Sequence, residues 1–126
     1  MKNSRIVLDA SAFGALIFRE PEAGEIELKV EGALCFAPSL IDYEMGSIFM
    51  KKLEIYQKER KTLHDCFDLY HQFPFDRLEI AIEPVAELAR KARLSFYDAS
   101  YLWLAQELGA ALITLDKKLQ RASQSK

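Results

Sequence analysis

Apolar residues recur along this chain with two different spacings, and the alternation of the two predicts the fold. Short continuous apolar runs are typical of buried strands, whereas apolar positions recurring roughly every three to four residues are typical of helices. The predicted strands span residues 5–9, 33–37, 78–81 and 111–115. The predicted helices span residues 11–19, 22–30, 39–53, 56–73, 84–93, 97–108 and 117–122. Strands that alternate with helices form a mostly parallel sheet covered by helices on both faces, so we expect an α/β fold.

Capping signals sharpen several helix boundaries. Ser39 and Asp42 have the spacing of a capping box, which makes Ser39 the expected N-cap of its helix. Ser95 is the expected cap of the helix that stops at Gly109. No linker or repeat interrupts the pattern, so we expect a single domain over residues 1–122 and a flexible tail over residues 123–126.

Composition narrows the class of protein. The chain has 126 residues and a formal net charge of -2, from 17 basic and 19 acidic residues. This balance does not favour nucleic-acid binding through bulk charge, so any such contact needs a local patch or a bound metal. No apolar run approaches the roughly 18 residues of a membrane helix. Cys35 and Cys66 lack metal-binding spacing and are typical of buried free thiols in a reducing compartment, so we expect a cytoplasmic protein with no membrane contact.

Four carboxylates lie where apolar runs give way to turns or helix starts: Asp9, Glu44, Asp98 and Asp116. Each has an ordinary alternative role. Asp9 and Asp116 suit helix N-caps, Asp98 suits the far end of a capping box, and Glu44 suits a surface position. If the strands are parallel, however, these positions converge on one edge of the sheet.

Carboxylates gathered at one edge repel each other unless a cation holds them, so the set predicts a site for Mg²⁺ or Mn²⁺. A metal of this kind activates a bound water and neutralises charge that develops on a phosphate. Ser11 follows Asp9 closely and is expected to align it, but Ser11 has no histidine partner for nucleophilic catalysis. The histidines, His64 and His71, fall on one predicted helix, far in sequence from the acids.

Basic residues lie close to two of the acids. Lys117, Lys118 and Arg121 follow Asp116, and Arg93 precedes the Asp98 segment. Helix ends commonly carry solvated cations that complement the helix dipole. The alternative is that these residues bind phosphate groups of a substrate near the metal.

Four segments resemble, in order, the motifs of PIN-domain nucleases: residues 6–12, 38–44, 94–105 and 112–119. The size of the chain is most similar to that of the VapC toxins of type II toxin–antitoxin pairs. The resemblance implies a Mg²⁺- or Mn²⁺-dependent endoribonuclease that cuts structured RNA such as tRNA or rRNA. It also implies a homodimer and a cognate antitoxin. By motif position, Asp9, Glu44, Asp98 and Asp116 are implied as the catalytic metal ligands, with Ser11 and Thr114 as supporting hydroxyls.

Two other functions are compatible with the resemblance: a housekeeping PIN nuclease of rRNA maturation, and a catalytically silent PIN-like binding module. Arg93 departs from the family pattern, in which a small or glycine-containing turn is commoner. Phe13, Ile17 and Phe18 are expected either in the core or in a groove for an antitoxin helix.

Overall fold

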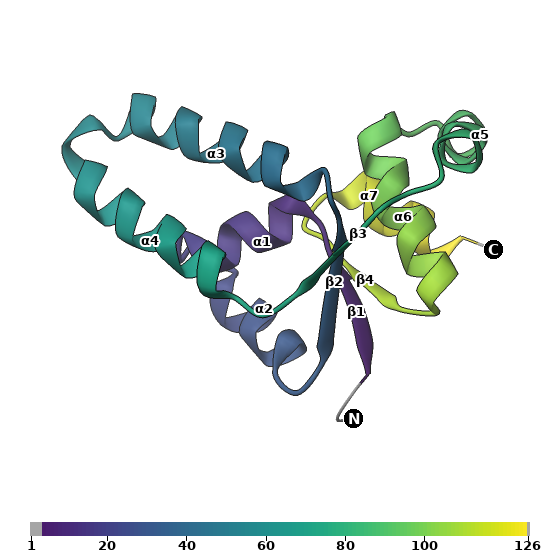
Figure 1. Ribbon diagram of the computed structural model, residues 1–126, viewed down its shortest axis with the longest axis horizontal. Helices are drawn as coiled ribbons and strands as arrows, with labels where there is room; N and C mark the ends of the chain where they lie inside the picture. The colour runs from purple at the N-terminus through teal and green to yellow at the C-terminus, as the bar shows by residue number, and fades with distance from the viewer. Residues whose placement is uncertain (1–3, 126) are drawn as a thin grey trace.

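The computed structural model describes residues 4–125 and confirms a single α/β domain with an all-parallel sheet (Figure 1). The strands are β1 (Arg5–Leu8), β2 (Leu34–Pro38), β3 (Asp76–Leu78) and β4 (Ala111–Ile113). The helices are α1 (Ala10–Ile17), α2 (Ala23–Val30), α3 (Ile41–Ile55), η1 (Gln57–Glu59), α4 (Arg60–Gln72), α5 (Ile82–Ala92), α6 (Phe96–Leu108) and α7 (Lys117–Gln124).

The strand order of the sheet is β3-β2-β1-β4. Val7 of the inner strand β1 pairs with Phe36 of β2 on one side and with Leu112 of β4 on the other. The chain builds outward from β1 to β3 and then returns to β4 beside β1. The carboxyl ends of β1 and β4 therefore meet at a point where the strand order reverses, which is where open α/β sheets bind ligands.

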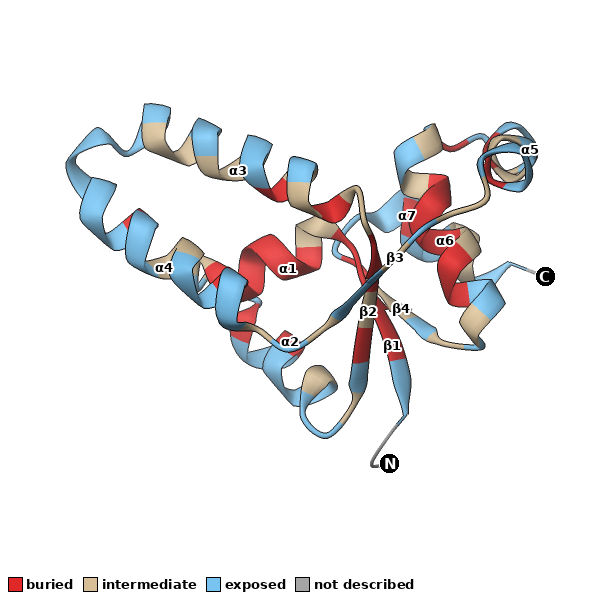
Figure 2. Ribbon diagram, in the orientation of Figure 1, coloured by how far each residue is buried: buried red, intermediate tan, exposed pale blue. Residues whose placement is uncertain are grey.

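Helices cover both faces of the sheet, as predicted (Figure 1). One layer contains α1 to α4, and its core centres on Phe13, whose ring makes edge contacts with Tyr70, Phe73 and Phe75. The other layer contains α5, α6 and α7, and a second core includes Val85 and Leu119, both fully buried. In Figure 2 the buried residues lie mainly in the inner strands β1 and β2 and in α1 and α6.

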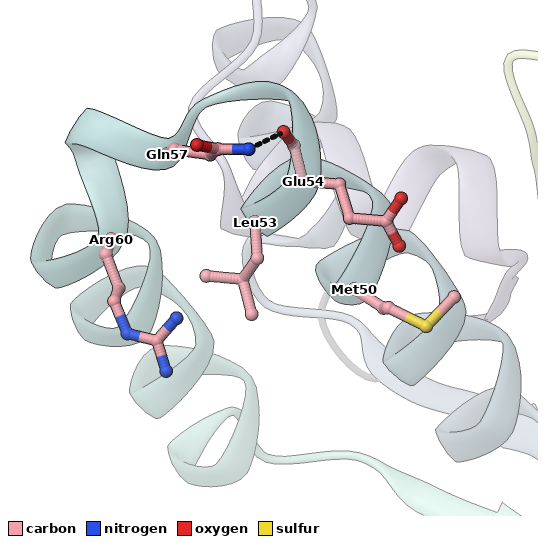
Figure 3. A pocket seen from close by; sticks show the side chains of 5 residues that line it. All are labelled: Met50, Leu53, Glu54, Gln57 and Arg60. Carbon is pink, nitrogen blue, oxygen red and sulfur yellow. Dashed lines mark hydrogen bonds between the residues drawn. The ribbon is translucent and has the colours of Figure 1, made fainter.

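Helices α3 and α4 form a long hairpin that projects from the sheet (Figure 1). Its far end is largely exposed (Figure 2). A shallow hollow of about 430 Å³ lies there, where the side chain of Gln57 donates a hydrogen bond to the carbonyl oxygen of Glu54 (Figure 3). The hollow is also lined by Met50, Leu53 and Arg60.

The third strand lies at residues 76–78 rather than at the predicted 78–81. The last residue pair between β2 and β3 joins Pro38 to Leu78, and β2 ends at that proline. Residues 79–81 therefore have no strand beside them, because the neighbouring chain has already turned towards α3. Their apolar pattern has a different cause, since Ile80 packs against the second core.

The predicted capping box at Ser39 is wrong. The Ser39 hydroxyl donates to the Glu79 carboxylate at 2.6 Å, and α3 begins at Ile41 without a side-chain cap. The predicted helix over residues 56–73 is also divided, because the turn η1 precedes α4. The final helix runs to Gln124, two residues beyond its predicted end. None of the helices in residues 4–125 is long and apolar enough to cross a membrane.

The core interpretation of the apolar residues in α1 is confirmed. Phe13 and Ile17 are buried, and Phe18 is half-buried and packs against the main core. Phe13 and Phe18 pack under the α3–α4 hairpin, and Ile17 also lines a surface pocket together with Leu69 and Phe73. Cys35 is buried, Cys66 is half-buried, and both are free thiols.

Candidate active site

Asp9 occupies the first position after β1 and caps α1, as predicted. Its Oδ1 atom accepts hydrogen bonds from the backbone N–H of Ala12 at 2.9 Å and from the Ser11 hydroxyl at 2.7 Å. Its Oδ2 atom accepts from the Thr114 hydroxyl at 2.5 Å. The residue is only 4% exposed, so this carboxylate is held rigidly inside the edge of the sheet.

Ser11 and Thr114 have the supporting positions that the motifs implied. Besides donating to Asp9, each hydroxyl accepts a backbone N–H, from Leu115 to Ser11 and from Asp116 to Thr114, both at 3.0 Å. The hydroxyls thereby tie the start of α1 to the chain that leaves β4. This network fixes Asp9 and Asp116 on adjacent segments.

Glu44 lies in the first turn of α3 and is half-buried. Its carboxylate accepts a hydrogen bond from the phenol of Tyr101, a residue of α6 that is 1% exposed. Burial and the neighbouring Glu44 charge raise the pKa of the Tyr101 phenol, which therefore keeps its proton and donates. Glu44 is consequently not a freely solvated surface residue.

Asp98 and Asp116 complete the edge. Ser95 caps α6, as predicted, and accepts the backbone N–H of Asp98 at 3.0 Å. Asp116 caps α7, because its Oδ1 atom accepts the N–H of Leu119 at 2.8 Å. The expected capping roles of Asp9, Ser95 and Asp116 are thus confirmed. The three helices that they cap begin at the same edge of the sheet.

The charges of these acids influence one another's pKa values. Burial raises the pKa of Asp9 above its usual value, and the charge of Asp98 adds to the rise despite hydrogen bonds that favour the anion. Burial also raises the pKa of Glu44, and the charges of Asp98 and Asp9 raise it further. Burial and the charge of Asp116 raise the pKa of Asp98. The pKa values of Asp9, Glu44 and Asp98 are therefore raised, mainly by burial and to a smaller extent by the charges of neighbouring acids.

The donors match a hard divalent cation in kind, because all four are carboxylates and such ions prefer oxygen ligands. Within residues 4–125, no three His, Cys, Asp or Glu side chains are arranged closely enough to hold an ion as they stand. Binding of one ion by this set would thus require the carboxylates to close in. Their raised pKa values show why a cation would favour this, since it would relieve burial and mutual repulsion.

The basic residues singled out in the sequence are all exposed: Lys117, Lys118, Arg121 and Arg93. The pKa of Asp98 is raised overall, and the positive charge of Lys118 offsets part of that rise. Lys118 therefore lies near the acids. Arg93 ends α5 in the left-handed conformation with φ of 58°. This is the turn in which glycine is common, so the departure from the family pattern concerns loop geometry. His64 and His71 are exposed on α4, as predicted.

Two features of the site were missed by sequence reasoning. The first is Tyr101, whose phenol donates a hydrogen bond to Glu44. The sequence feature that could have indicated this contact is a tyrosine within the apolar face of α6. A second cluster binds Asp42, which accepts from the Tyr70 hydroxyl at 2.5 Å and from Arg77 at 2.8 Å. This cluster fixes the start of α3 against α4 and β3. Its members are far apart in sequence, and no local pattern announces them.

Comparisons with known proteins identify the family of this chain. The sequence model of the PIN domain matches residues 6–124. The chain is 30% identical to VapC ribonuclease Mb0985 of Mycobacterium bovis over 95% of its length and 92% of that protein. It is 27% identical to ribonuclease VapC3 of Pyrobaculum aerophilum over 91% of its length and 92% of that protein.

The fold is similar to the crystal structure of PAE2754 from Pyrobaculum aerophilum, with a TM-score of 0.64 and 24% identity, over 94% of this chain and 79% of that one. Fold, motif order and family match agree over nearly the whole of residues 4–125. This chain belongs to the PIN-domain family.

Proposed function

We propose that the protein is a Mg²⁺- or Mn²⁺-dependent endoribonuclease of the VapC type. The observation that carries the proposal is the edge formed by Asp9, Glu44, Asp98 and Asp116, where burial and mutual repulsion raise the pKa of three carboxyls. The relatives named VapC ribonuclease and ribonuclease VapC3, matched over more than nine tenths of the chain, support RNA as the substrate.

The roles of the residues follow from their contacts. Asp9 is the most rigid ligand, because three hydrogen bonds fix its carboxylate. Glu44 is held by Tyr101 from the opposite helix layer. Asp98 and Asp116 lie at the starts of α6 and α7 and are more exposed than Asp9. A metal bound by these carboxylates would supply a water of lowered pKa, which is the chemistry that phosphodiester hydrolysis needs.

Lys117, Lys118 and Arg121 are proposed to bind RNA phosphates beside the acids, with Arg93 at the edge of the same surface. The support is their exposure and the influence of Lys118 on Asp98. A cluster of cations is needed here, because the net charge of the chain is -2 and four acids repel RNA until a metal binds.

A cognate antitoxin, a homodimer and a cytoplasmic location are further parts of the proposal. Their support is the resemblance to VapC proteins. The α3–α4 hairpin offers exposed apolar side chains for a protein partner, among them Met50, Ile55 and Leu69.

The function is tested by incubating the purified protein with total cellular RNA in Mg²⁺ or Mn²⁺ and mapping the cut ends. We expect discrete cuts that disappear with EDTA and in Asp98→Asn. The position of the cuts separates a toxin acting on tRNA or rRNA from an enzyme of rRNA maturation. Absence of cleavage by protein freed of co-purifying partners would contradict the proposal and favour a silent binding module.

A further inference from the structure

The five tyrosines of the chain fall into two groups with different surroundings. Tyr70 and Tyr101 are each 1% exposed, and both phenols donate to carboxylates. Tyr43, Tyr56 and Tyr97 are 83%, 51% and 59% exposed. Within residues 4–125, neither Tyr43 nor Tyr97 makes a side-chain hydrogen bond. Folding therefore leaves more than half of the surface of both Tyr43 and Tyr97 exposed.

The positions of Tyr43 and Tyr97 relate directly to the acids. Tyr43 immediately precedes Glu44 in the first turn of α3, and Tyr97 immediately precedes Asp98 in the first turn of α6. Both helices begin at the carboxyl edge of the sheet, and the Asp98 charge acts on Glu44. The two rings therefore flank the acids from two different helices.

The local geometry explains why the rings are exposed while their neighbours are held inside. Residues 42 and 44 each lie about 100° around the helix from residue 43. Asp42 and Glu44 are hydrogen-bonded to the buried phenols of Tyr70 and Tyr101. Tyr43 lies between these two anchored acids and is directed outward. Tyr97 keeps only an edge contact with Phe96, with ring centroids 6.0 Å apart.

We propose that Tyr43 and Tyr97 form a stacking platform for unpaired bases on either side of the cleaved phosphate. This inference rests on the proposed function, because it takes RNA as the molecule that crosses the acids. A phosphate held by Lys118 and by a metal at the acids would bring the adjoining bases to the same edge. Exposed aromatic rings bind unpaired bases by their faces with little regard to sequence. The substrate class is therefore single-stranded RNA or a loop whose bases are turned outward.

An RNA occupant explains the surface better than a protein occupant. The exposed apolar groups here are separated by carboxylates, because Leu115, which is 40% exposed, precedes Asp116 just as the tyrosines precede their acids. An apolar protein face laid over this edge would bury charged groups at a high cost in free energy. An RNA strand bound with a metal can contact both the carboxylates and the exposed rings. Its phosphates would lie towards the acids, and its bases would stack on the rings.

The test measures binding rather than cleavage, in the unmodified protein and its tyrosine variants, with Ca²⁺ in place of Mg²⁺ to prevent turnover. Two fluorescein-labelled probes are compared by anisotropy: a short unstructured oligoribonucleotide and an abasic oligomer with the same number of phosphates. We expect Tyr43→Ala and Tyr97→Ala each to weaken binding of the base-bearing probe roughly 5- to 100-fold. Binding of the abasic probe should be unchanged, and Tyr43→Phe should restore affinity because it keeps the ring.

Tyr56→Ala is the matched control, because Tyr56 is an exposed tyrosine at the far end of the hairpin. It should bind both probes as the parent does. Equal affinity of the parent for the two probes, or unchanged affinity in both alanine variants, would overturn the platform. It would also be overturned if the variants kept RNA affinity but lost a co-purifying protein. The platform and the nuclease can also fail separately. If the alanine variants lose base-dependent binding but the unmodified protein never cleaves RNA, the platform is supported and the nuclease is refuted.

Discussion

The two ends of helix α3 have opposite characters. Its first turn, at the edge of the sheet, carries Asp42 and Glu44, which are partly buried and hydrogen-bonded to fully buried tyrosines. Its last turns, at the far end of the hairpin, carry Glu54, which is exposed and is hydrogen-bonded only through its backbone carbonyl (Figure 3). One helix thus joins a region where carboxylates are confined to a region where they are solvated.

The two ends of α3 also differ in what their carboxylates contribute to the stability of the fold. Confining several carboxylates at the sheet edge raises their pKa values, which means that the folded protein disfavours their charged forms. In the hairpin, the pair of Lys61 and Asp65 has side chains 90% and 62% exposed, and such pairs contribute little to stability. We therefore expect substitutions at the edge to change activity and substitutions in the hairpin to change little.

The largest expected contrast is between Asp9→Asn and Asp65→Asn. Asp9→Asn should lower RNA cleavage by at least about 100-fold, because it removes a charged ligand while the amide oxygen still caps α1. Asp65→Asn, in the hairpin, should leave the rate unchanged. Cleavage rates are measured beside thermal unfolding and circular dichroism. Equal loss in both variants would contradict the division between edge and hairpin.

The two buried tyrosines give the next contrast. Tyr101→Phe removes the phenol that holds Glu44, and we expect metal affinity and cleavage to fall roughly 10- to 100-fold, as when an orienting partner of a ligand is lost. Tyr70→Phe removes the bond to Asp42, and we expect a loss of about 1–3 kcal/mol in unfolding free energy with no change in metal affinity. Calorimetric Mn²⁺ titration and urea unfolding separate the two. Identical behaviour of the variants would show that Tyr101 is only structural.

Stability in the presence of a chelator should respond to pH with opposite signs at Asp9 and Asp42. Burial raises the pKa of Asp9, so its contribution to stability is full below the ordinary carboxyl pKa and is lost as pH rises through the raised value. Burial alone would raise the pKa of Asp42, but the hydrogen bonds from Arg77 and Tyr70 outweigh it and lower that pKa. Its contribution is present above the ordinary pKa and is lost as pH falls through the lowered value.

Urea unfolding at a series of pH values tests this contrast. Asp9→Asn should reduce the loss of stability on raising the pH from acid to neutral. Asp42→Asn should be destabilised near neutral pH and equal to the unmodified protein at acid pH. Parallel pH curves for the two variants would contradict the assignment of the raised and lowered pKa values.

The smallest expected effect concerns Arg93, which ends α5 with φ of 58°. Arg93→Gly should stabilise the fold by about 0.5–1 kcal/mol, because glycine adopts this conformation without a steric cost. Arg19, with φ of 54°, offers a matched substitution away from the acids. If Arg93 binds RNA, only Arg93→Gly should weaken RNA binding while both variants gain stability. Loss of stability in either variant would contradict the backbone argument.

Much of this architecture was accessible from local patterns. The alternation of apolar runs and helical periodicity predicted the parallel sheet, and the polar residues that follow β1 and β4 predicted that Asp9 and Asp116 meet at one edge. Helix caps such as Ser95 were predictable because their hydrogen bonds span only three residues.

The parts that escaped prediction depend on contacts between distant segments. The position of β3 is set by where its neighbour β2 ends, which the sequence around residue 78 does not reveal. Ser39 was expected to cap its own helix but instead bonds Glu79, forty residues away. The pairing of Tyr101 with Glu44 likewise joins α6 to α3. Rules that use only neighbouring residues cannot predict whether a side chain will form a hydrogen bond with a residue close in sequence or with one far along the chain.

The most direct measurement of the central claim is calorimetric titration of Mn²⁺ into the purified protein and its Asp98→Asn and Asp65→Asn variants. If the acids at the sheet edge close around a metal, the unmodified protein and Asp65→Asn should bind Mn²⁺ saturably with the same affinity. Asp98→Asn should bind it far more weakly. Saturable binding of equal strength in all three proteins, or none in the unmodified protein, would contradict the account.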